Sequence, residues 1–301
     1  MTAPPGHVWR ADRRRPGVLG VLNASPDSFS ANRVDAGAAV DLAVAMVADG
    51  VDVLDVGAQS LRTDRPEIPV EEEIDRLAPV LHALRDRLPD VALSVDTYRH
   101  EVVAASLEVG VAIVNDPSGL ADPQLADLLA SAIRRGPASA PSLVVAFNPG
   151  VPKERRPRGR RLGDPVGECL RFVSERLEVL ARAGVGPDHV ILDPGPDLYK
   201  APDETIEVLA AVPRLRAELG IDRVLWAVSR KDFVGVLTGR IPRERGAGTL
   251  GVLAAVDLAE HDLIRVHDVG ATVDFLTVRQ ALLDGPDGPL EMDDSIRYDP
   301  S

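Results

Sequence analysis

The sequence predicts a single α/β domain folded as a closed (β/α)8 barrel, the TIM-barrel architecture. Eight short runs of β-branched and aliphatic residues alternate with eight helix-length amphipathic stretches, which is typical of parallel strands joined by right-handed crossovers. Eight such units in roughly 250 residues match the usual extent of a barrel. No unit carries the G-x-G-x-x-G turn of an open dinucleotide-binding sheet, so closure is favoured.

The strands are predicted at short apolar runs, which suit strands buried on both faces, and the helices at the longer periodic stretches between them. In chain order the strands cover residues 18–23, 51–57, 91–96, 111–116, 142–147, 189–194, 223–229 and 263–268. The helices cover residues 36–49, 70–87, 100–109, 122–134, 164–183, 203–219, 246–260 and 271–283. Residues 17–283 therefore form the barrel, between a flexible N-terminal tail (1–16) and an acidic C-terminal tail (284–301).

Composition and charge exclude several classes of protein. With 34 Lys and Arg against 47 Asp and Glu, the formal charge is −13, so the molecule as a whole repels nucleic acid and anionic membranes. The single cysteine, Cys169, permits no intramolecular disulfide and no cysteine zinc site. There is no signal-peptide pattern and no run of 18 apolar residues, so we expect a cytoplasmic protein.

Polar residues stand at the ends of nearly all the predicted strands. A single Asp or Asn at such a place often caps the next helix or begins a turn. Caps do not require acids and amides within the apolar pattern of every strand, so the set indicates a shared mouth at the C-terminal rim, where barrel active sites are built. The residues are Asn23, Asp55, Asp96, Asn115, Asp116, Asp193, Ser229, Arg265, His267 and Asp268.

The chemistry of this rim favours a flat polar heterocycle and an anion. The carboxylates of Asp96 and Asp193 and the amide of Asn115 suit a ring with several N–H donors and an acceptor, such as a 2-amino-4-oxo-pteridine. Arg265 and His267 lie two apart on one strand, so both face the same way and can hold one anion near the usual phosphate site of this fold. Each residue alone also fits a helix cap or an ordinary rim position, and it is their joint placement that favours a site.

Seven motifs resemble, in order and spacing, those of dihydropteroate synthase, from about residue 17 to about residue 283. Singly, a motif such as LDPG is a weak signal, but each of the seven stands at the tip of its own predicted strand. The motifs are VLGVLNASPDSFS (18–30), LDVGAQSLR (54–62), SVDTYRHEV (94–102), IVND (113–116), ILDPG (191–195), SRKDFVG (229–235) and IRVHDV (264–269).

This resemblance implies a folate-pathway transferase, usually a homodimer. The family condenses 6-hydroxymethyl-7,8-dihydropterin pyrophosphate with p-aminobenzoate, giving 7,8-dihydropteroate and pyrophosphate with Mg2+. No covalent enzyme nucleophile is needed, because a pterin methylene cation is thought to develop as the diphosphate departs.

The resemblance also assigns roles by position. Asp96, Asn115 and Asp193 match the residues that hydrogen-bond the pterin, and Lys231 matches the lysine beside its ring. Asn23 matches the asparagine associated with Mg2+ and pyrophosphate. The cations that bind the diphosphate match Arg62, Arg265 and His267, and Arg265 also stacks on the pterin. The expected catalytic residues are Asp96, Lys231 and Arg265.

Departures from the family pattern cluster where p-aminobenzoate is expected, a region for which the candidate residues are Phe29, Leu61, Thr63 and Asp232. In the second loop, Leu61 replaces a threonine and Thr63 a proline. Asp232 replaces a serine near the p-aminobenzoate carboxylate, and the repulsion costs about 1 kcal/mol at an effective dielectric near 20 unless Lys231 or Arg230 neutralises it.

Two further loops also depart from the family. The sixth loop reads P-D-L-Y-K over residues 196–200 where the family has G-F-G-K, so its glycines are lost. After the fifth strand, A-F-N over residues 146–148 replaces M-H-M, and Phe147 is expected to form a wall of the pterin site. The basic excursion 149–163 that follows is either an anion-attracting lid or a solvated charge run.

Three functional hypotheses remain open at this level. The leading one is a dihydropteroate synthase or a divergent second copy of one. The second is a pterin-binding paralogue without synthase activity, acting as a regulatory or accessory subunit. The third, a methyltetrahydrofolate methyltransferase domain, is disfavoured because the chain has no corrinoid-binding domain.

Overall fold

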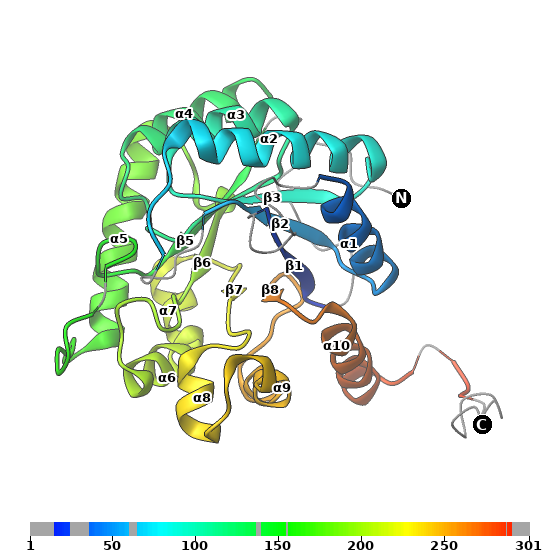
Figure 1. The fold of residues 1–301 in the computed structure, drawn as a ribbon. Coiled ribbons are helices and arrows are strands. Elements are labelled where there is room, and N and C mark those ends of the chain that lie inside the picture. The colour runs from blue at the N-terminus through cyan, green and yellow to red at the C-terminus, as the bar shows by residue number, and fades with distance from the viewer. Residues whose placement is uncertain are drawn as a thin grey trace.

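The computed structural model shows eight parallel strands ringed by helices (Figure 1). It describes residues 15–24, 36–59, 65–136, 140–154, 156–286 and 288–290. The strands are β1 Gly17–Asn23, β2 Val53–Gly57, β3 Ala92–Asp96, β4 Ile113–Asp116, β5 Ser142–Ala146, β6 Val190–Asp193, β7 Leu225–Trp226 and β8 Leu263–Val266.

Ten α-helices lie among the described residues. They are α1 Ala36–Ala48, α2 Val70–Arg87, α3 His100–Val109, α4 Gln124–Arg134, α5 Pro165–Ala183, α6 Pro202–Ala210, α7 Val212–Leu219, α8 Asp232–Thr238, α9 Gly246–Ala255 and α10 Val269–Asp284. The described residues also form two short 3-10 helices, η2 Pro187–His189 and η3 Pro242–Glu244. No helix of this described part of the chain is long and apolar enough to cross a membrane.

The strand order makes the sheet a nearly closed barrel and confirms the predicted fold class. Neighbouring strands pair in parallel in the order β6-β5-β4-β3-β2-β1-β8-β7. The remaining gap, between β6 and β7, is joined by one parallel bridge from Leu192 to Val224. The carboxyl ends of the strands therefore meet at one rim.

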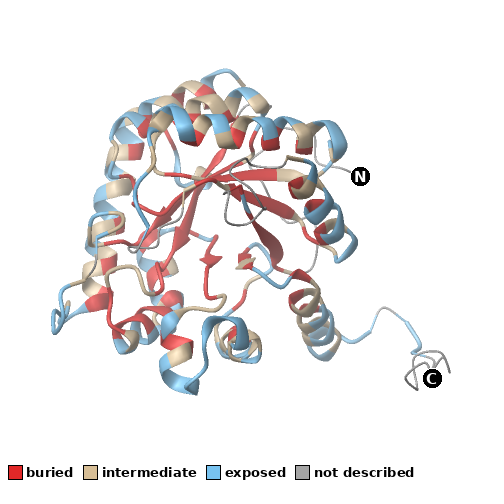
Figure 2. Ribbon diagram, in the orientation of Figure 1, coloured by how far each residue is buried: buried red, intermediate tan, exposed pale blue. Residues whose placement is uncertain are grey.

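The strands lie between an inner and an outer apolar layer, and their residues are mostly buried (Figure 2). Inside the barrel, Leu19, Val53, Ile113, Val144, Ile191, Leu225, Ala227 and Leu263 form one cluster. A larger cluster fills the space between the strands and the helices. Because side chains alternate along a strand, every second residue faces the barrel axis, and this alternation decides which polar residues reach the mouth.

The structure differs from the predicted elements mainly in the last third of the chain. The single helix predicted over 203–219 divides at Ala211, because Pro213 has no N–H to continue a helix and instead stands in the first turn of α7. The run predicted as a strand over 223–229 pairs only at Leu225–Trp226. Helix α8 was not predicted, since its seven residues include Gly235 and two valines.

Candidate active site

Four inner-layer residues are each followed, two positions later, by a polar residue on the same face of the strand. This spacing sets a polar floor directly above the apolar filling of the barrel. The pairs are Val53 and Asp55, Ile113 and Asn115, Ile191 and Asp193, and Leu263 and Arg265. The predicted site residues on β4, β6 and β8 are therefore brought together with Asp55 at one end of the barrel.

Arg265 lies at the centre of this floor, held by two carboxylates. Its Nε donates to Oδ2 of Asp55 at 2.6 Å, and its Nη2 donates to Oδ2 of Asp96 at 2.6 Å. Asp55 is fully buried and also accepts from Ser94 Oγ at 2.6 Å and Asn115 Nδ2 at 3.2 Å. The guanidinium is thus fixed in direction by groups from β2 and β3 before any ligand arrives.

In the sequence, Asp55 stands out as a strand end but is not assigned to the site. The signal was available, because Asp55 follows the inner-layer residue Val53 at the same spacing by which Asp193 follows Ile191. Its three contacts make it the common partner of Arg265 and Asn115, two residues that were predicted.

The carboxylates of Asp55 and Asp193 are buried, and the side chain of Asp96 is 16% exposed. Burial raises the pKa of Asp96 to about 7, although the positive charge of Arg265 opposes the rise. Burial likewise raises the pKa of Asp193, and the charge of Lys231 is the largest effect opposing it. Asp193 Oδ1 accepts from Gly195 N at 2.8 Å. Lys231 therefore acts electrostatically on both carboxylates.

His267 lies at the mouth above Arg265. Its Nδ1 is 2.9 Å from Ser229 Oγ, at the end of the segment that follows β7. His267 is exposed at the mouth. Even so, partial burial of the imidazole, together with the charges of Arg265, Arg230 and Lys231, lowers the pKa of His267 to about 4. The ring is therefore neutral at pH 7 in the free protein, and an arriving anion would meet a neutral histidine flanked by fixed cations.

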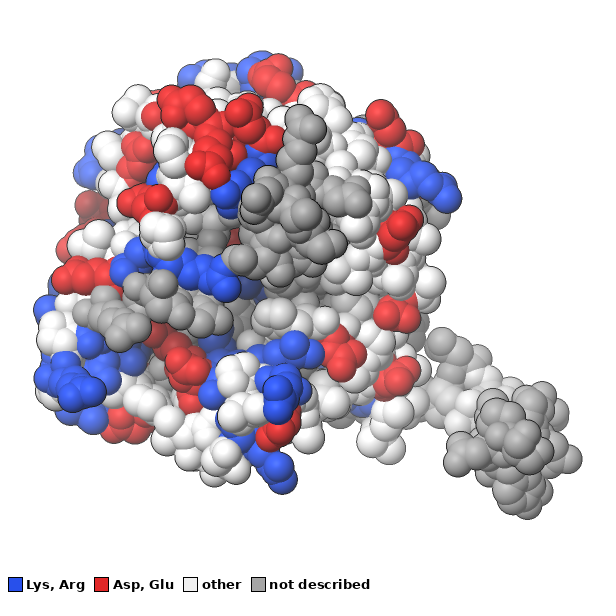
Figure 3. All heavy atoms as spheres, viewed as in Figure 1, with Lys and Arg blue, Asp and Glu red and all other residues white. Residues whose placement is uncertain are grey.

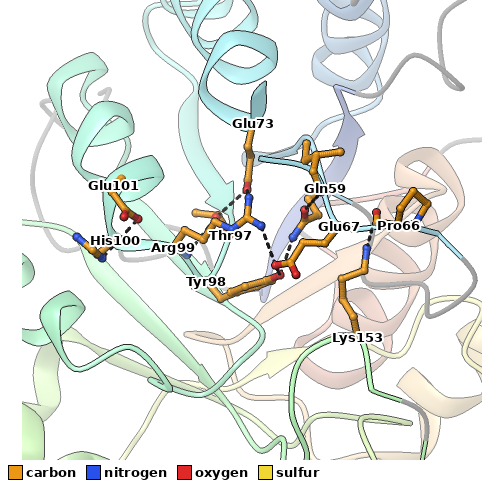
Figure 4. A network of polar contacts seen from close by, with 11 residues as sticks. Gln59, Pro66, Glu67, Glu73, Thr97, Tyr98, Arg99, His100, Glu101 and Lys153 are labelled. Carbon is orange, nitrogen blue, oxygen red and sulfur yellow. Dashed lines mark hydrogen bonds and ion pairs between the residues drawn. The ribbon is translucent and has the colours of Figure 1, made fainter. Parts of the chain in front are cut away.

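The loops after β2 and β3 are joined by a network of polar contacts (Figure 4). Gln59 accepts from Ile68 N at 3.0 Å and donates to Tyr98 OH at 2.6 Å. Arg99 bridges Glu67 and the buried Glu73 at 2.7 and 2.8 Å. The contact from Gln59 to Ile68 closes the base of the second loop, which carries Arg62.

Comparison with known proteins supports the family that the sequence motifs resemble. The family model described as pterin binding enzyme matches residues 19–267. A dihydropteroate synthase from Synechocystis is 34% identical over 277 residues, covering 89% of this chain and 91% of that protein. One from Neisseria meningitidis serogroup C is 33% identical over 286 residues, covering 92% and 98%. The chain belongs to the dihydropteroate synthase family.

Solved structures of family members agree in fold over nearly the whole chain. Dihydropteroate synthase from Xanthomonas albilineans with 4-aminobenzoic acid matches with a TM-score of 0.80 and 35% identity, covering 94% of this chain and 100% of that one. The same enzyme in complex with 7,8-dihydropteroate matches with a TM-score of 0.78 and 34% identity, covering 95% and 99%.

Four of the residues assigned from the family resemblance lie outside the described residues: Phe29, Leu61, Arg62 and Thr63. Asn23 is described, and it stands exposed at the end of β1, beside Gly57 of β2. Of the predicted diphosphate residues, the structure thus brings Asn23, Arg265 and His267 to the rim.

Phe147 does not line the mouth as the family comparison suggested. Its side chain is fully buried and packs edge to face against Phe172 of α5, with ring centroids 5.5 Å apart. Lys200 Nζ lies 4.1 Å from the ring centroid and donates to the Phe147 carbonyl at 2.7 Å. The ring belongs to the outer core because Phe147 continues the outward-facing series of Leu143 and Val145 in β5.

The charge of Asp232 is neutralised by a residue that was not expected. Its Oδ1 lies 2.8 Å from Nη1 of Arg245, rather than pairing with Lys231 or Arg230, and its side chain is 81% exposed. Arg245 lies against Gly235, where a Cβ would come within 2.3 Å of the guanidinium. The repulsion expected between Asp232 and an arriving carboxylate is therefore reduced.

The basic excursion after β5 contacts the rim at two places. Lys153 donates to the Pro66 carbonyl at 3.0 Å, which joins this excursion to the second loop (Figure 4). Arg160 lies 5.1 Å from the centroid of the Tyr199 ring, in the sixth loop. In Figure 3 basic side chains gather at the left of the view, where the chain leaving β5 runs, although the formal charge of the whole molecule is −13.

Proposed function

We propose that this protein is a dihydropteroate synthase, which condenses 6-hydroxymethyl-7,8-dihydropterin pyrophosphate with p-aminobenzoate in folate biosynthesis. The observation that carries the proposal is the polar floor, in which Asp96, Asn115 and Asp193 surround Arg265 at the mouth of a barrel of this family. The Xanthomonas albilineans relative that was solved with 7,8-dihydropteroate supports the same product.

The pterin ring binds to the floor through its N–H donors in this proposal. The Asp96 and Asp193 carboxylates accept hydrogen bonds from the ring, while the Asn115 amide supplies a further polar contact. Arg265 stacks on the ring, and Lys231 lies beside it. Because Asp55 and Asp96 already hold Arg265, little side-chain freedom is lost on binding.

The diphosphate is held above the floor by Arg265, His267, Arg62 and Asn23. Among the described residues no group of three His, Cys, Asp or Glu could hold a metal ion. The amide oxygen of Asn23 suits an Mg2+ whose other ligands are water and diphosphate oxygens, as is common for this ion. Bound there, Mg2+ would offset negative charge on the departing diphosphate.

The reaction forms one C–N bond and breaks one C–O bond. The amine nitrogen of p-aminobenzoate attacks the pterin methylene carbon, the bond from that carbon to the diphosphate oxygen breaks, and the amine loses a proton to water. Positive charge that develops on the pterin is stabilised by Asp96 and Asp193, and Arg265 and His267 stabilise the leaving diphosphate. In this proposal the catalytic residues are Asp96 and Arg265, together with Lys231 beside the pterin ring.

Placement of the second substrate rests on Phe29, Leu61, Thr63 and Asp232, where the chain departs most from the family. A pterin-binding paralogue without synthase activity is the alternative that these departures favour. Complementation of a bacterial strain that lacks its own dihydropteroate synthase separates the two. Growth without an added folate-pathway product supports the synthase, whereas no growth, with soluble protein that still binds pterin, supports the paralogue.

The proposal includes a homodimer and a cytoplasmic location. Two apolar grooves of about 550 and 670 Å3 flank α9, and the second is lined by Leu282 and Leu283 of α10, which are 81% and 63% exposed. Such a surface suits burial against a second copy. Light scattering after size exclusion tests it, since the dimer has twice the mass of one chain and Leu282→Asp should halve that mass.

A further inference from the structure

The sixth loop contains a carboxylate at a position where the backbone favours glycine. Asp197 has φ of +65°, in the left-handed region that non-glycine residues rarely occupy, and Tyr199 two residues later has φ of +55°. An aspartate here accepts a backbone cost that a glycine would avoid. Its backbone N–H donates to Thr205 Oγ1 at 3.1 Å, which fixes the residue against α6.

The side chain of Asp197 reaches across to the seventh loop. Its Oδ2 accepts from the backbone N–H of Asp232 and its Oδ1 accepts from that of Phe233 at 3.3 Å. These are the first two N–H groups of α8, which has no capping side chain of its own, because Lys231 occupies the N-cap position. Asp197, in the loop between β6 and α6, thus supplies the N-terminal cap that the sequence next to α8 lacks.

The same carboxylate lies within the field of the site lysine. Burial raises the pKa of Asp197, and the charge of Lys231 is the largest effect that opposes the rise, while the carboxylate of Asp232 adds to it. The negative charge of Asp197 also opposes the lowering of the Lys200 pKa that burial causes. Lys231 therefore acts electrostatically on Asp197 as well as on Asp96 and Asp193.

We propose that Asp197 is a positioning residue for Lys231: by capping α8 through the N–H groups of Asp232 and Phe233 it fixes the backbone from which the lysine side chain extends. The inference rests on the proposed function insofar as Lys231 contacts the pterin. It predicts that this chain depends on a carboxylate at a position where the backbone conformation favours glycine.

The first test needs no ligand. Amide hydrogen exchange of Asp232 and Phe233 is compared in the wild type, Asp197→Gly and Asp197→Asn. The glycine variant should fold, because it relieves the positive φ, and its two amides should exchange about tenfold faster. Asp164→Ala is the matched control, since Asp164 Oδ1 caps α5 through Gly167 N at 2.9 Å on the same rim but far in sequence from α8. Unchanged exchange in Asp197→Gly overturns the proposal.

The second test measures the effect on the site. Calorimetric titration with 6-hydroxymethyl-7,8-dihydropterin pyrophosphate should give about tenfold weaker binding for Asp197→Gly and a smaller loss for Asp197→Asn, whose amide oxygen still accepts one hydrogen bond. Asp164→Ala should bind like the wild type. In a Lys231→Met background, Asp197→Gly should cause no further loss, because its effect passes through the lysine.

Additive losses in the double variant, or an equal loss in Asp164→Ala, overturn the proposal, since both indicate only general destabilisation. The outcome is separable from the proposed function. If the wild type binds the pterin but shows no turnover with p-aminobenzoate, the synthase assignment fails while the binding cycle still decides the role of Asp197. If the wild type does not bind the pterin, the exchange measurement decides it.

Discussion

Arg265 Nε lies 2.6 Å from Oδ2 of Asp55, so the last strand of the barrel is joined to the second by an ion pair at the mouth. The two residues flank β1, where Leu19 lies opposite Arg265 and Val21 opposite Asp55 in the strand register. Because Asp55 is fully buried, this pair also closes part of the barrel between β8 and β2. Binding geometry and fold stability are therefore coupled at Asp55.

Replacing Asp55 by alanine should lower both stability and binding. The change leaves the Arg265 guanidinium without its buried partner, and we expect a loss of about 3 kcal/mol in the free energy of unfolding. Ser94→Ala removes one hydrogen bond to the same carboxylate and should cost about 1 kcal/mol. Urea denaturation measures both, and equal losses in the two variants would show that the ion pair carries no special weight.

Pterin binding should depend on pH through Asp96. Hydrogen bonds from the ring favour the ionised carboxylate, so the pKa of about 7 in the free protein falls on binding and a proton is released. Affinity should then rise as pH increases from about 6 to about 8. Calorimetry in buffers of different ionisation enthalpy detects the proton, and Asp96→Asn should remove the dependence.

Replacing Asp96 by alanine should raise the dissociation constant for the pterin about 100-fold, because an ionised acceptor and a partner of Arg265 are both lost. Asp122→Ala, on the loop before α4, is a suitable comparison because it also removes a carboxylate paired with a basic side chain, His100. A wild-type dissociation constant in Asp96→Ala would contradict the assignment of this residue to the pterin.

Diphosphate binding should have the opposite pH dependence. The pKa of His267 is about 4 in the free protein, and an adjacent diphosphate raises it, so the histidine takes up a proton when the anion binds. Pyrophosphate affinity should therefore increase as pH falls from about 7 toward 5. His267→Gln keeps a polar side chain and should lose this increase. If affinity is flat in the wild type over the same range, His267 does not hold the diphosphate.

Asp232→Ser should change the KM for p-aminobenzoate by less than about twofold, because the carboxylate is exposed and already paired with Arg245. Removing the partner is the more informative change. Arg245→Ala leaves Asp232 unneutralised and removes the contact of Arg245 with the Arg230 carbonyl at 2.9 Å. We expect its KM for p-aminobenzoate to rise, and a lower KM in Asp232→Ser than in the wild type would restore the original repulsion argument.

The barrel and its polar rim could be predicted because they depend on local patterns. Period-two alternation places Asp193 and Arg265 toward the mouth whatever the neighbouring strands do, and motif order fixes which strand each belongs to. The pairing of Asp55 with Arg265 could not be predicted in this way. It depends on the stagger of β8 and β2 about β1, which the sequence of any one strand does not state.

Helix α8 and the position of Phe147 differ from the expectation for separate reasons. Helix α8 forms from a weak helical sequence because Asp197, 35 positions earlier in the chain, caps it. Phe147 was expected in the mouth by its place in a motif, but period-two alternation after Leu143 and Val145 directs its ring outward, against Phe172 of α5. Of the two, only the capping of α8 depends on a partner from another βα unit.

The central claim is tested most directly by pyrophosphate release from 6-hydroxymethyl-7,8-dihydropterin pyrophosphate, measured with and without p-aminobenzoate. The purified protein should release pyrophosphate only when both substrates and Mg2+ are present, forming one 7,8-dihydropteroate for each pyrophosphate, and Asp96→Ala should not. Tight pterin binding without release that depends on p-aminobenzoate would contradict the synthase assignment and leave a pterin-binding paralogue.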